Sequence, residues 1–453
     1  MEQEYRDKDY IYTPANNVNS TPPPFPWESD AEPAGPAEPF SEYEETISEI
    51  PEPYSKSAES DSESFEHDSE SPKPDFETSE PGFETTKPDF ETSKPDFESP
   101  AGFESVEPVS DHDLSKTYEN AGKIFSVLFD EIGKVIVGQE ETIEQVLISL
   151  LCNGHALLES NPGLGKTLTI STISKVVDLS FNRIQCTPDL MPADITGTTI
   201  VEERDGRKSF RFEKGPVFAN IILADEINRA SPKTQSALLE AMQEKQVTVA
   251  GHTYPLDKPF FVLATQNPIE QEGTYPLPEA QLDRFLLKIL VPYPKYEEEL
   301  EIVNRYTAQT TPTTTRGISK ETLSNLQKLT REVPISNDLK TQTIQFVMKT
   351  RDGGAIEYGA SPRASIALIL AAKARALIKG RNYVSQEDVA LMAYPVLRHR
   401  IILSFEAERM GVTPDDAIED LLADMGLIAA RSKPADAEES KGGLKSKLPF
   451  GKK

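Results

Sequence analysis

The stretch best suited to chemistry is the loop Ser160-Asn161-Pro162-Gly163-Leu164-Gly165-Lys166-Thr167. A short apolar segment, 155–159, precedes it, and a helical pattern starts at Leu168. Strand, glycine-bearing loop and Lys-Thr at a helix start is the order of a phosphate-binding P-loop. Glycines let backbone N–H groups approach the phosphates closely, and the N-terminus of the following helix adds positive charge. We therefore predict that residues 161–167 bind the polyphosphate of a nucleotide.

One position departs from the P-loop pattern G-x-x-x-x-G-K-[ST], because Ser160 stands where the first glycine is expected. Gly163 and Gly165 remain, and they should line the phosphate cradle most closely. We expect Lys166 to reach the outer phosphates and the Thr167 hydroxyl to ligate Mg²⁺. The predicted cofactors are therefore ATP and Mg²⁺, and Ser160 should affect nucleotide affinity only modestly.

Two acids, Asp225 and Glu226, end a nearly continuous apolar run over 219–226. Such runs are typical of central parallel strands, whose carboxyl ends gather functional groups. With a P-loop upstream, we predict that Asp225 holds the water shell of Mg²⁺ and that Glu226 polarises the attacking water. Asn267 follows another buried strand, 260–265, and could orient the same water, unless it only makes an Asn-Pro turn.

The elements that position these residues alternate between apolar strands and amphipathic helices, which predicts an α/β fold with a parallel sheet. Helices are expected over 121–135 and 141–151, before the P-loop. Asp205-Gly206 and Gly251 each lie between two alternating runs, which predicts two inserted β-hairpins. A short helix over 279–285 carries Arg284.

The chain also divides by composition and periodicity. Residues 1–112 are rich in Pro, Ser and Glu and too poor in apolar residues to fold, so we predict that they are disordered. Residues 1–110 contain 29 Asp and Glu against 6 Lys and Arg, so −23 of the net charge of −28 lies there. We predict an α/β core over 113–294, an all-α domain over 295–430 and a flexible basic tail over 431–453.

A seven-residue repeat runs through the acidic region and places Phe76, Phe83, Phe90 and Phe97 at equal spacing. A proline in every repeat excludes a coiled-coil helix. Two interpretations stay open, a solvated acidic tether or a row of phenylalanine anchors that dock on a partner.

Several classes of protein are disfavoured by composition. The folded remainder is close to neutral, which argues against binding of nucleic acid. No apolar run reaches transmembrane length and the N-terminus lacks signal-peptide character, so we expect no membrane segment and a cytoplasmic location. Cys152 and Cys186 each end an apolar segment, which indicates buried thiols rather than a disulfide or a metal pair.

Several linked blocks between about 135 and 428 carry a family resemblance. In order they are Pro162-Gly163-Leu164-Gly165-Lys166-Thr167, Leu223-Ala224-Asp225-Glu226-Ile227-Asn228-Arg229-Ala230, Ser236 to Glu244, Ala264-Thr265-Gln266-Asn267-Pro268 and Glu279 to Phe285. Together they resemble the AAA+ ATPases of the MoxR type. The resemblance implies a three-layer α/β P-loop domain with a parallel sheet and an all-α helical lid.

The resemblance also implies roles for individual residues in the core. Lys166 and Thr167 match the Walker A positions, Asp225 and Glu226 match Walker B, and Asn267 matches sensor 1. The hairpins match the helix-2 and pre-sensor-1 insertions of this clade.

Three arginines are implicated in the same way. Arg284 resembles the arginine finger that reaches the nucleotide of the neighbouring subunit, and Arg363 resembles sensor 2 in the lid. A second trans-acting role for Arg229 is left open.

The function that the resemblance implies is ATP hydrolysis by a homo-oligomeric ring, a hexamer in this family, that remodels a partner protein. Family members act as chaperones in metalloenzyme maturation or cofactor insertion, often with a von Willebrand factor A domain protein. Two alternatives remain, a magnesium chelatase-like motor subunit and a nucleotide-dependent scaffold that recruits partners through its acidic tail.

Overall fold

The computed structural model describes residues 111–204, 207–268, 273–309, 312–314 and 317–429. Helix α2 (Asp111–Gly133) opens the described part of the chain, close to the predicted start of the core at 113. The acidic region with its phenylalanine repeat and the basic tail lie outside the described residues.

A five-stranded parallel sheet forms the centre of the core in the order β2-β5-β8-β1-β9. Its strands are β1 (Ala156–Glu159), β2 (Phe181–Gln185), β5 (Ile221–Asp225), β8 (Phe261–Gln266) and β9 (Leu287–Leu290). β5 is buried along its whole length and β8 along all but its last residue. Both faces of these central strands are therefore covered, as their continuous apolar sequence predicts.

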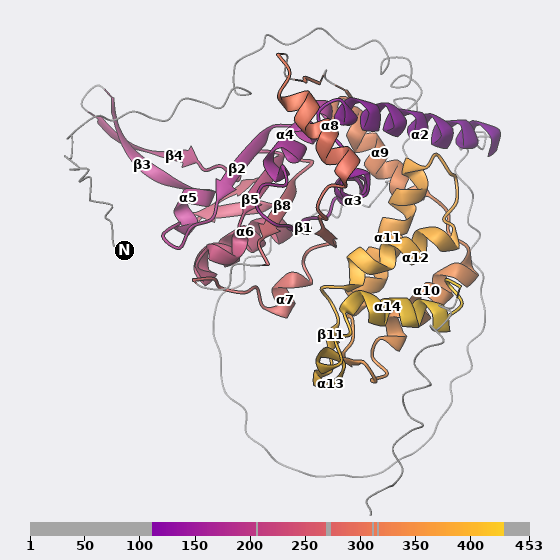
Figure 1. The fold of residues 1–453 in the computed structure, drawn as a ribbon. Helices are drawn as coiled ribbons and strands as arrows, with labels where there is room; N and C mark the ends of the chain where they lie inside the picture. The colour runs from indigo at the N-terminus through magenta and orange to yellow at the C-terminus, as the bar shows by residue number, and fades with distance from the viewer. Residues whose placement is uncertain (1–110, 205–206, 269–272, 310–311, 315–316, 430–453) are drawn as a thin grey trace, which may run out of the picture.

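Alternate side chains of the strands enter two different hydrophobic clusters. Leu223 and Leu263 belong to the larger cluster, with α3 (Glu140–Leu151) and α4 (Lys166–Val176). Ile222 and Val262 belong to the smaller one, with α6 (Pro232–Glu244). Helices thus cover both faces of the sheet (Figure 1), and the predicted three-layer α/β arrangement is confirmed.

Two antiparallel hairpins branch from the core, as predicted. One pairs β3 (Gly197–Arg204) with β4 (Arg207–Lys214) and projects away from the sheet (Figure 1), and its predicted turn at Asp205-Gly206 lies outside the described residues. The other pairs β6 (Gln246–Val249) with β7 (His252–Pro255). The rings of Phe212 and Tyr254 stack with their centroids 4.1 Å apart, so the two hairpins support each other.

The second part of the chain is helical, as its periodicity predicts. Its helices are α8 (Tyr296–Tyr306), α9 (Lys320–Glu332), α10 (Asn337–Lys349), α11 (Pro362–Ile378), α12 (Gln386–Leu397), α13 (Phe405–Arg409) and α14 (Pro414–Asp424). A small antiparallel ladder of β10 (Ile356–Tyr358) and β11 (Ile402–Leu403) adds to the helices that the sequence predicts.

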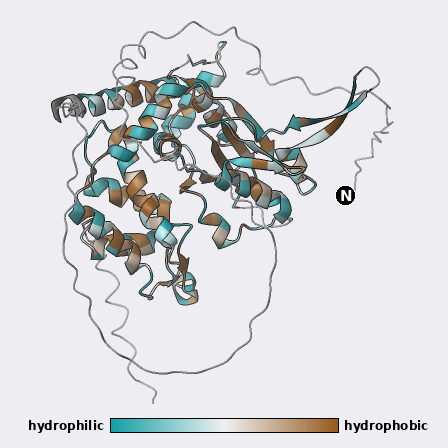
Figure 2. Cartoon of the chain, turned by 180° about the vertical axis from the view of Figure 1, so that it is seen from behind, coloured by the Kyte–Doolittle hydropathy of each residue, from teal (hydrophilic) through white to brown (hydrophobic). Residues whose placement is uncertain are grey.

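Core and lid share one hydrophobic interior. The larger cluster extends from Leu263 in the sheet through α3 and α9 to Leu368 in α11 and Val396 in α12. Figure 2 shows apolar stretches on the strands of the core and on the lid helices. Across the described residues, no helix combines the length and apolar character that crossing a bilayer requires.

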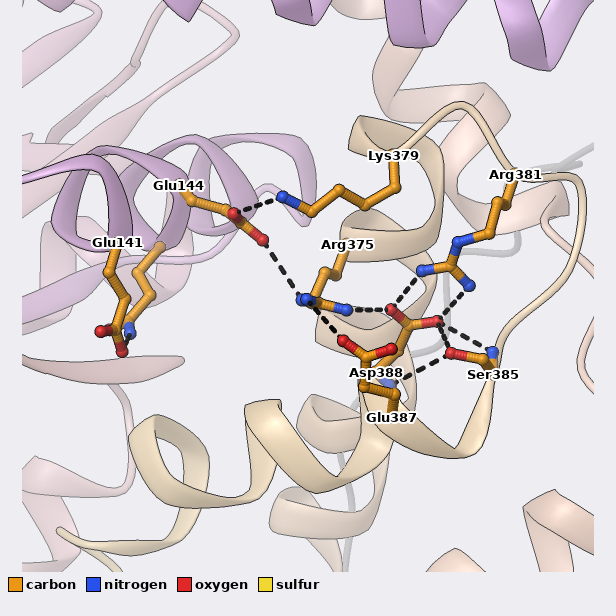
Figure 3. A network of polar contacts seen from close by, with 9 residues as sticks. Glu141, Glu144, Arg375, Lys379, Arg381, Ser385, Glu387 and Asp388 are labelled. Carbon is orange, nitrogen blue, oxygen red and sulfur yellow. Dashed lines mark hydrogen bonds and ion pairs between the residues drawn. The ribbon is translucent and has the colours of Figure 1, made fainter.

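An ionic network also ties the lid to the core (Figure 3). Asp388 of α12 is fully buried and accepts hydrogen bonds from Arg375 at 2.6 Å and from Arg381 at 2.6 and 2.7 Å. Arg375 of α11 and Lys379, directly after that helix, form ion pairs with Glu144 of α3 at 3.2 and 2.8 Å. Because Asp388 and Arg375 are nearly excluded from water, each relies on the other to compensate its charge.

Candidate active site

The P-loop connects the end of β1 to the first turn of α4. Gly163 and Gly165 have φ angles of 84° and 73°, a region that side chains disfavour. A Cβ built at either glycine would meet no described atom within 4 Å, so the loop backbone borders open space where phosphate oxygens could approach. The φ angle of Ser160 is not positive, so the backbone at this position does not need a glycine. The departure from the P-loop pattern is therefore compatible with the cradle.

Two side chains outside the glycine positions hold the loop. Lys166 Nζ donates a hydrogen bond to the carbonyl of Ser160 at 3.3 Å, and Gln139 Nε2 donates to the carbonyl of Leu164 at 3.2 Å. Gln139 itself has a φ of 61° directly before α3. Gln139 was not predicted to belong to the site, although it follows Gly138 at the start of a helix, a place where an unusual backbone conformation is common.

The first acid, Asp225, ends β5 and is buried. Its Oδ1 accepts a hydrogen bond from the Thr265 hydroxyl at 2.6 Å, and its Oδ2 forms an ion pair with Arg183 at 2.7 Å. Arg183 lies on the neighbouring strand β2, where Gln185 pairs in register with Asp225. Both carboxylate oxygens therefore have a donor, which keeps this buried charge compensated.

The second acid, Glu226, follows β5 in a left-handed conformation with φ 56° and ψ 51°. Its backbone N–H donates to Thr265 Oγ1 at 2.9 Å. Its carboxylate accepts a hydrogen bond from Gln185 at 3.1 Å and pairs with Arg229 of η1 (Ile227–Arg229) at 3.2 Å. The turn thus directs Glu226 away from the strand axis while two side chains hold its carboxylate.

The parallel register brings these groups to one edge of the sheet. Glu159, the last residue of β1, pairs with Gln266, the last residue of β8, and Asn267 follows directly and is buried. Asp225 ends β5, which pairs with β8 on its other side. The P-loop, both acids and Asn267 therefore lie together at the carboxyl edge of the sheet, as predicted.

Arg284 lies at the opposite edge. It follows the short helix α7 (Glu279–Leu282) and precedes β9, whose first residue Leu287 pairs with Ala156 at the start of β1. Its guanidinium donates to the carbonyl of Leu239 at 3.2 Å. With Gly154, Arg284 lines a cavity of about 250 Å³. The chain thus separates Arg284 from its own P-loop by the length of β1.

Arg363, in the first turn of α11, lines the same cavity. Its guanidinium lies 3.8 Å from Asp283, and its side chain is 54% exposed. Asp283 also pairs with Arg400 at 2.8 Å and accepts a hydrogen bond from Ser361 at 3.1 Å. Asp283 therefore anchors the start of α11 beside Arg284, and the structure groups the two predicted arginines with each other rather than with the P-loop.

Arg400, which also pairs with Asp283, was not predicted from the sequence to lie near Arg284 and Arg363. Burial lowers the pKa of its guanidinium, and the contact with Asp283 opposes that shift. Arg400 also donates to the carbonyl of Leu286 at 3.0 Å, and it contacts the carbonyl of Phe285 as well. An arginine at the end of a helical pattern carries no sequence signal for such a role, because its partners come from a segment 114 residues away.

Cys186 lies beside the acidic pair, where its backbone N–H donates to the Asp225 carbonyl at 2.9 Å. Burial raises the pKa of its thiol to about 12, and the nearby Asp225 and Glu226 carboxylates act in the same direction. The thiol is therefore protonated at neutral pH and cannot serve as a nucleophile. Cys186 is a free buried cysteine, as the sequence predicts.

The residues at the carboxyl edge fit a magnesium–nucleotide complex. The loop offers backbone N–H groups and Lys166 to phosphates, while Asp225 and the Thr167 hydroxyl are the oxygen donors that Mg²⁺ prefers. Thr167 lies in the first turn of α4, next to the glycines that leave the cradle open. A parallel sheet with a P-loop at its carboxyl edge and a helical lid defines a P-loop nucleotide-binding protein.

Comparison with known proteins specifies the family. Residues 155–287 match the ATPase family associated with various cellular activities (AAA), and residues 348–421 match the AAA lid domain. "Chaperone MoxR1" of Mycobacterium tuberculosis is 45% identical over 67% of this chain and 82% of its own length. "Uncharacterized protein YeaC" of Bacillus subtilis is 44% identical over 67% of this chain and 94% of its own length.

A solved structure agrees with these matches. It is the crystal structure of a Cytophaga hutchinsonii protein that its authors assigned as an ATPase. The sequence of that protein is 47% identical to this chain, and the two structures superpose with a TM-score of 0.64. The match covers 69% of this chain and 96% of that chain. The chain belongs to the MoxR-type AAA+ ATPases.

Proposed function

We propose that this protein binds ATP with Mg²⁺ at the carboxyl edge of its sheet and hydrolyses it with arginines supplied by a neighbouring copy. The observation that carries the proposal is the separation of the site residues. Lys166, Asp225 and Glu226 lie at one edge of the sheet, and Arg284 lies at the other. A head-to-tail arrangement of copies unites the two groups in every site.

The residues at the carboxyl edge bind the phosphates, hold the metal ion and activate the water in this mechanism. The loop N–H groups and Lys166 bind the phosphates, and Thr167 and Asp225 hold the Mg²⁺, which neutralises charge on the phosphate oxygens when bound. Glu226 accepts a proton from the attacking water as a general base, and Asn267 orients that water. The contacts of Glu226 with Gln185 and Arg229 must loosen before its carboxylate can face the water.

The arginines act from the neighbouring copy. Arg284 stabilises charge that develops on the transferred phosphoryl group, and Arg363 assists from the lid. Asp283 contacts Arg363 and directly precedes Arg284, so the two arginines lie close together on one face of the chain. The assembly is a ring, a hexamer by family resemblance, and the lid transmits nucleotide state to the ring.

The cellular role follows the family. The name of the M. tuberculosis relative supports a chaperone function. We propose that the ring remodels a client protein in the cytoplasm, with metalloenzyme maturation or cofactor insertion as the process and a von Willebrand factor A domain protein as the partner.

The test compares ATP turnover of the full chain with that of Glu226→Gln, Arg284→Ala and the control Arg409→Ala, an exposed arginine on α13. We expect turnover to fall about 10²-fold or more for Glu226→Gln and about 10³-fold for Arg284→Ala, with little change for the control. An equimolar mixture of the two inactive variants should regain turnover, because Glu226 and Arg284 then meet at mixed interfaces. Wild-type turnover in both variants would instead favour a nucleotide-dependent scaffold.

A further inference from the structure

Arg400, which lies just after the lid helix α12, is a buried cation whose partners belong mainly to the segment that carries Arg284. Its side chain is only 3% exposed. A guanidinium group has five N–H donors in a fixed fork, and burial is costly unless each donor finds an acceptor. Nε donates to Asp283 Oδ1 at 2.8 Å. Nη1 donates to the Leu286 carbonyl at 3.0 Å and also contacts the Val396 carbonyl.

The fork of Arg400 holds the backbone on both sides of Arg284. Its last nitrogen, Nη2, donates to the Asp283 carbonyl at 3.5 Å and contacts the Phe285 carbonyl. All five donors therefore have an acceptor, and four of these five acceptors belong to residues 283–286. Because the guanidinium group is planar and rigid, these contacts fix the backbone around Arg284 and leave the Arg284 side chain out of the fork.

The two residues before Arg400 contact the same part of the chain. His399 is buried, and its Nε2 donates to the Phe285 carbonyl at 3.1 Å. Arg398 Nη1 donates to the Lys288 carbonyl at 3.3 Å. We call these three consecutive residues the α12 clamp. The α12 clamp thus joins the end of a lid helix to a segment of the core through backbone carbonyls, which are present whatever the side chains of that segment are.

Asp283 connects the α12 clamp to both arginines of the proposed mechanism. Its Oδ1 accepts the hydrogen bond from Arg400, whereas its Oδ2 accepts one from Ser361 at 3.1 Å and lies 3.8 Å from the Arg363 guanidinium. Asp283 also directly precedes Arg284 in the chain. The orientation that Arg400 imposes on this carboxylate therefore bears on the start of α11 as well as on the backbone of Arg284.

We propose that Arg400 is a positioning residue for Arg284 and Arg363, so that the lid determines where a chain presents both guanidinium groups. The inference rests on the proposed function, which assigns these arginines to the nucleotide of a neighbouring copy. Arg400 acts through Asp283 and the surrounding carbonyls rather than on the nucleotide. A residue that only stabilised its own fold would affect its own site, whereas a positioning role places the effect of Arg400 in the site of the neighbour.

The first test measures kcat, the KM for ATP and thermal unfolding of full-length Arg400→Lys, which keeps the charge but loses the fork. We expect kcat to fall about 10- to 100-fold, because a catalytic group displaced by about 1 Å loses activity on this scale. The KM should stay within about twofold, because the variant keeps its own P-loop. The matched control is Arg375→Lys, which alters another largely buried lid arginine that pairs with Asp388 instead. It should lower the unfolding temperature but leave kcat near the wild-type value.

The second test separates positioning from a structural role by mixing copies. Glu226→Gln lacks its own general base but keeps an intact α12 clamp and both arginines, which it can supply to a neighbouring Arg400→Lys copy. With Glu226→Gln in excess, turnover per Arg400→Lys chain should therefore rise about tenfold, whereas turnover per Arg375→Lys chain should not rise. An unchanged rate in the first mixture would overturn the inference, because the defect would then lie in the variant's own site.

A second variant covers the case in which Arg400→Lys does not fold. Asp283→Asn keeps an acceptor for Arg400 in a side chain that is 22% exposed, and it should show the same fall in kcat and the same rise on mixing. Arg284→Ala is the reference for the proposed function. If Arg284→Ala keeps wild-type turnover, the proposed function fails and this inference with it. If Arg284→Ala is inactive while Arg400→Lys and Asp283→Asn turn over ATP like the wild type, only the positioning role is overturned.

Discussion

The hydroxyl of Thr265 lies 2.6 Å from Asp225 Oδ1 and joins the two acids of the site through one side chain. It donates to Asp225 and at the same time accepts the backbone N–H of Glu226 at 2.9 Å. Thr265 is completely buried on β8, one strand away from the acids. A single hydroxyl therefore sets both the orientation of the Asp225 carboxylate and the start of the turn that directs Glu226.

Replacing Thr265 should separate shape from hydrogen bonding. Thr265→Val keeps the volume but leaves the buried Asp225 oxygen and the Glu226 N–H without this partner, so we expect a loss of about 1–3 kcal/mol in unfolding free energy. ATP turnover should fall more than stability would explain, because both acids lose their positioning. Thr265→Ser, which keeps the hydroxyl, is the control. Urea unfolding and ATPase assays measure the two effects, and equal turnover in both variants would contradict the positioning role.

Arg183 should tune the response of the site to magnesium. Its guanidinium pairs with Asp225 at 2.7 Å, so it places a positive charge against the carboxylate that is predicted to hold Mg²⁺. In Arg183→Ala the Mg²⁺ concentration needed for half-maximal nucleotide binding should decrease severalfold, whereas Arg183→Lys should stay close to the wild type. Because Arg183 is about half exposed, stability should change by less than about 1 kcal/mol. The measurement is a Mg²⁺ titration of the binding of a fluorescent ATP analogue. A Mg²⁺ midpoint that is unchanged in Arg183→Ala would show that Arg183 does not compete with Mg²⁺ for Asp225.

The ionic network between α11 and α12 should make stability depend on acid pH. Burial alone would raise the pKa of Asp388, but hydrogen bonds from Arg381, Ser385 and Arg375 outweigh it, and the pKa lies below the ordinary 3.8. The folded state therefore favours the charged form, so this contribution is present above about pH 4 and is lost as the pH falls through the folded pKa.

Asp388→Asn removes that charge while keeping the shape. At pH 7 we expect the variant to lose about 3–5 kcal/mol, because Arg375 and Arg381 keep their charges without the carboxylate. Urea unfolding at pH 7, 5 and 3.5 should show a difference from the wild type that is constant between the first two values and smaller at the last. If the difference in unfolding free energy between Asp388→Asn and the wild type stays the same at pH 3.5, the charge of the Asp388 carboxylate does not cause it.

Ser160→Gly tests the departure from the P-loop pattern. Ser160 is buried, its carbonyl accepts a hydrogen bond from the Lys166 ammonium group, and its backbone does not require a positive φ. Glycine should therefore change nucleotide affinity by only about threefold and cost up to about 1 kcal/mol through chain entropy. Equilibrium binding of an ATP analogue provides the measurement, and complete loss of binding would show that the loop works differently.

The periodic segments could be predicted because local sequence decides them. The apolar run that ends at Asp225 and the Gly163-Leu164-Gly165-Lys166 loop each carry their structure within a few residues, and the parallel arrangement follows from the alternation of strands and helices. The meeting of these residues at the carboxyl edge of the sheet could therefore be predicted from the sequence, including the place of Asn267 after β8. The hairpin of β6 and β7 was marked by Gly251 for the same local reason.

What only the tertiary structure decided are the contacts between segments distant in the chain. Nothing near Arg183 or Thr265 in the sequence indicates that both bind Asp225, because each reaches it from another strand. The placement of Arg284 with Arg363, away from the P-loop, depends on which ends of β1 and β9 pair. Helix α8 is a further case, since periodicity places Tyr296, Leu300 and Val303 on one side of the helix but only packing determines that this side is exposed.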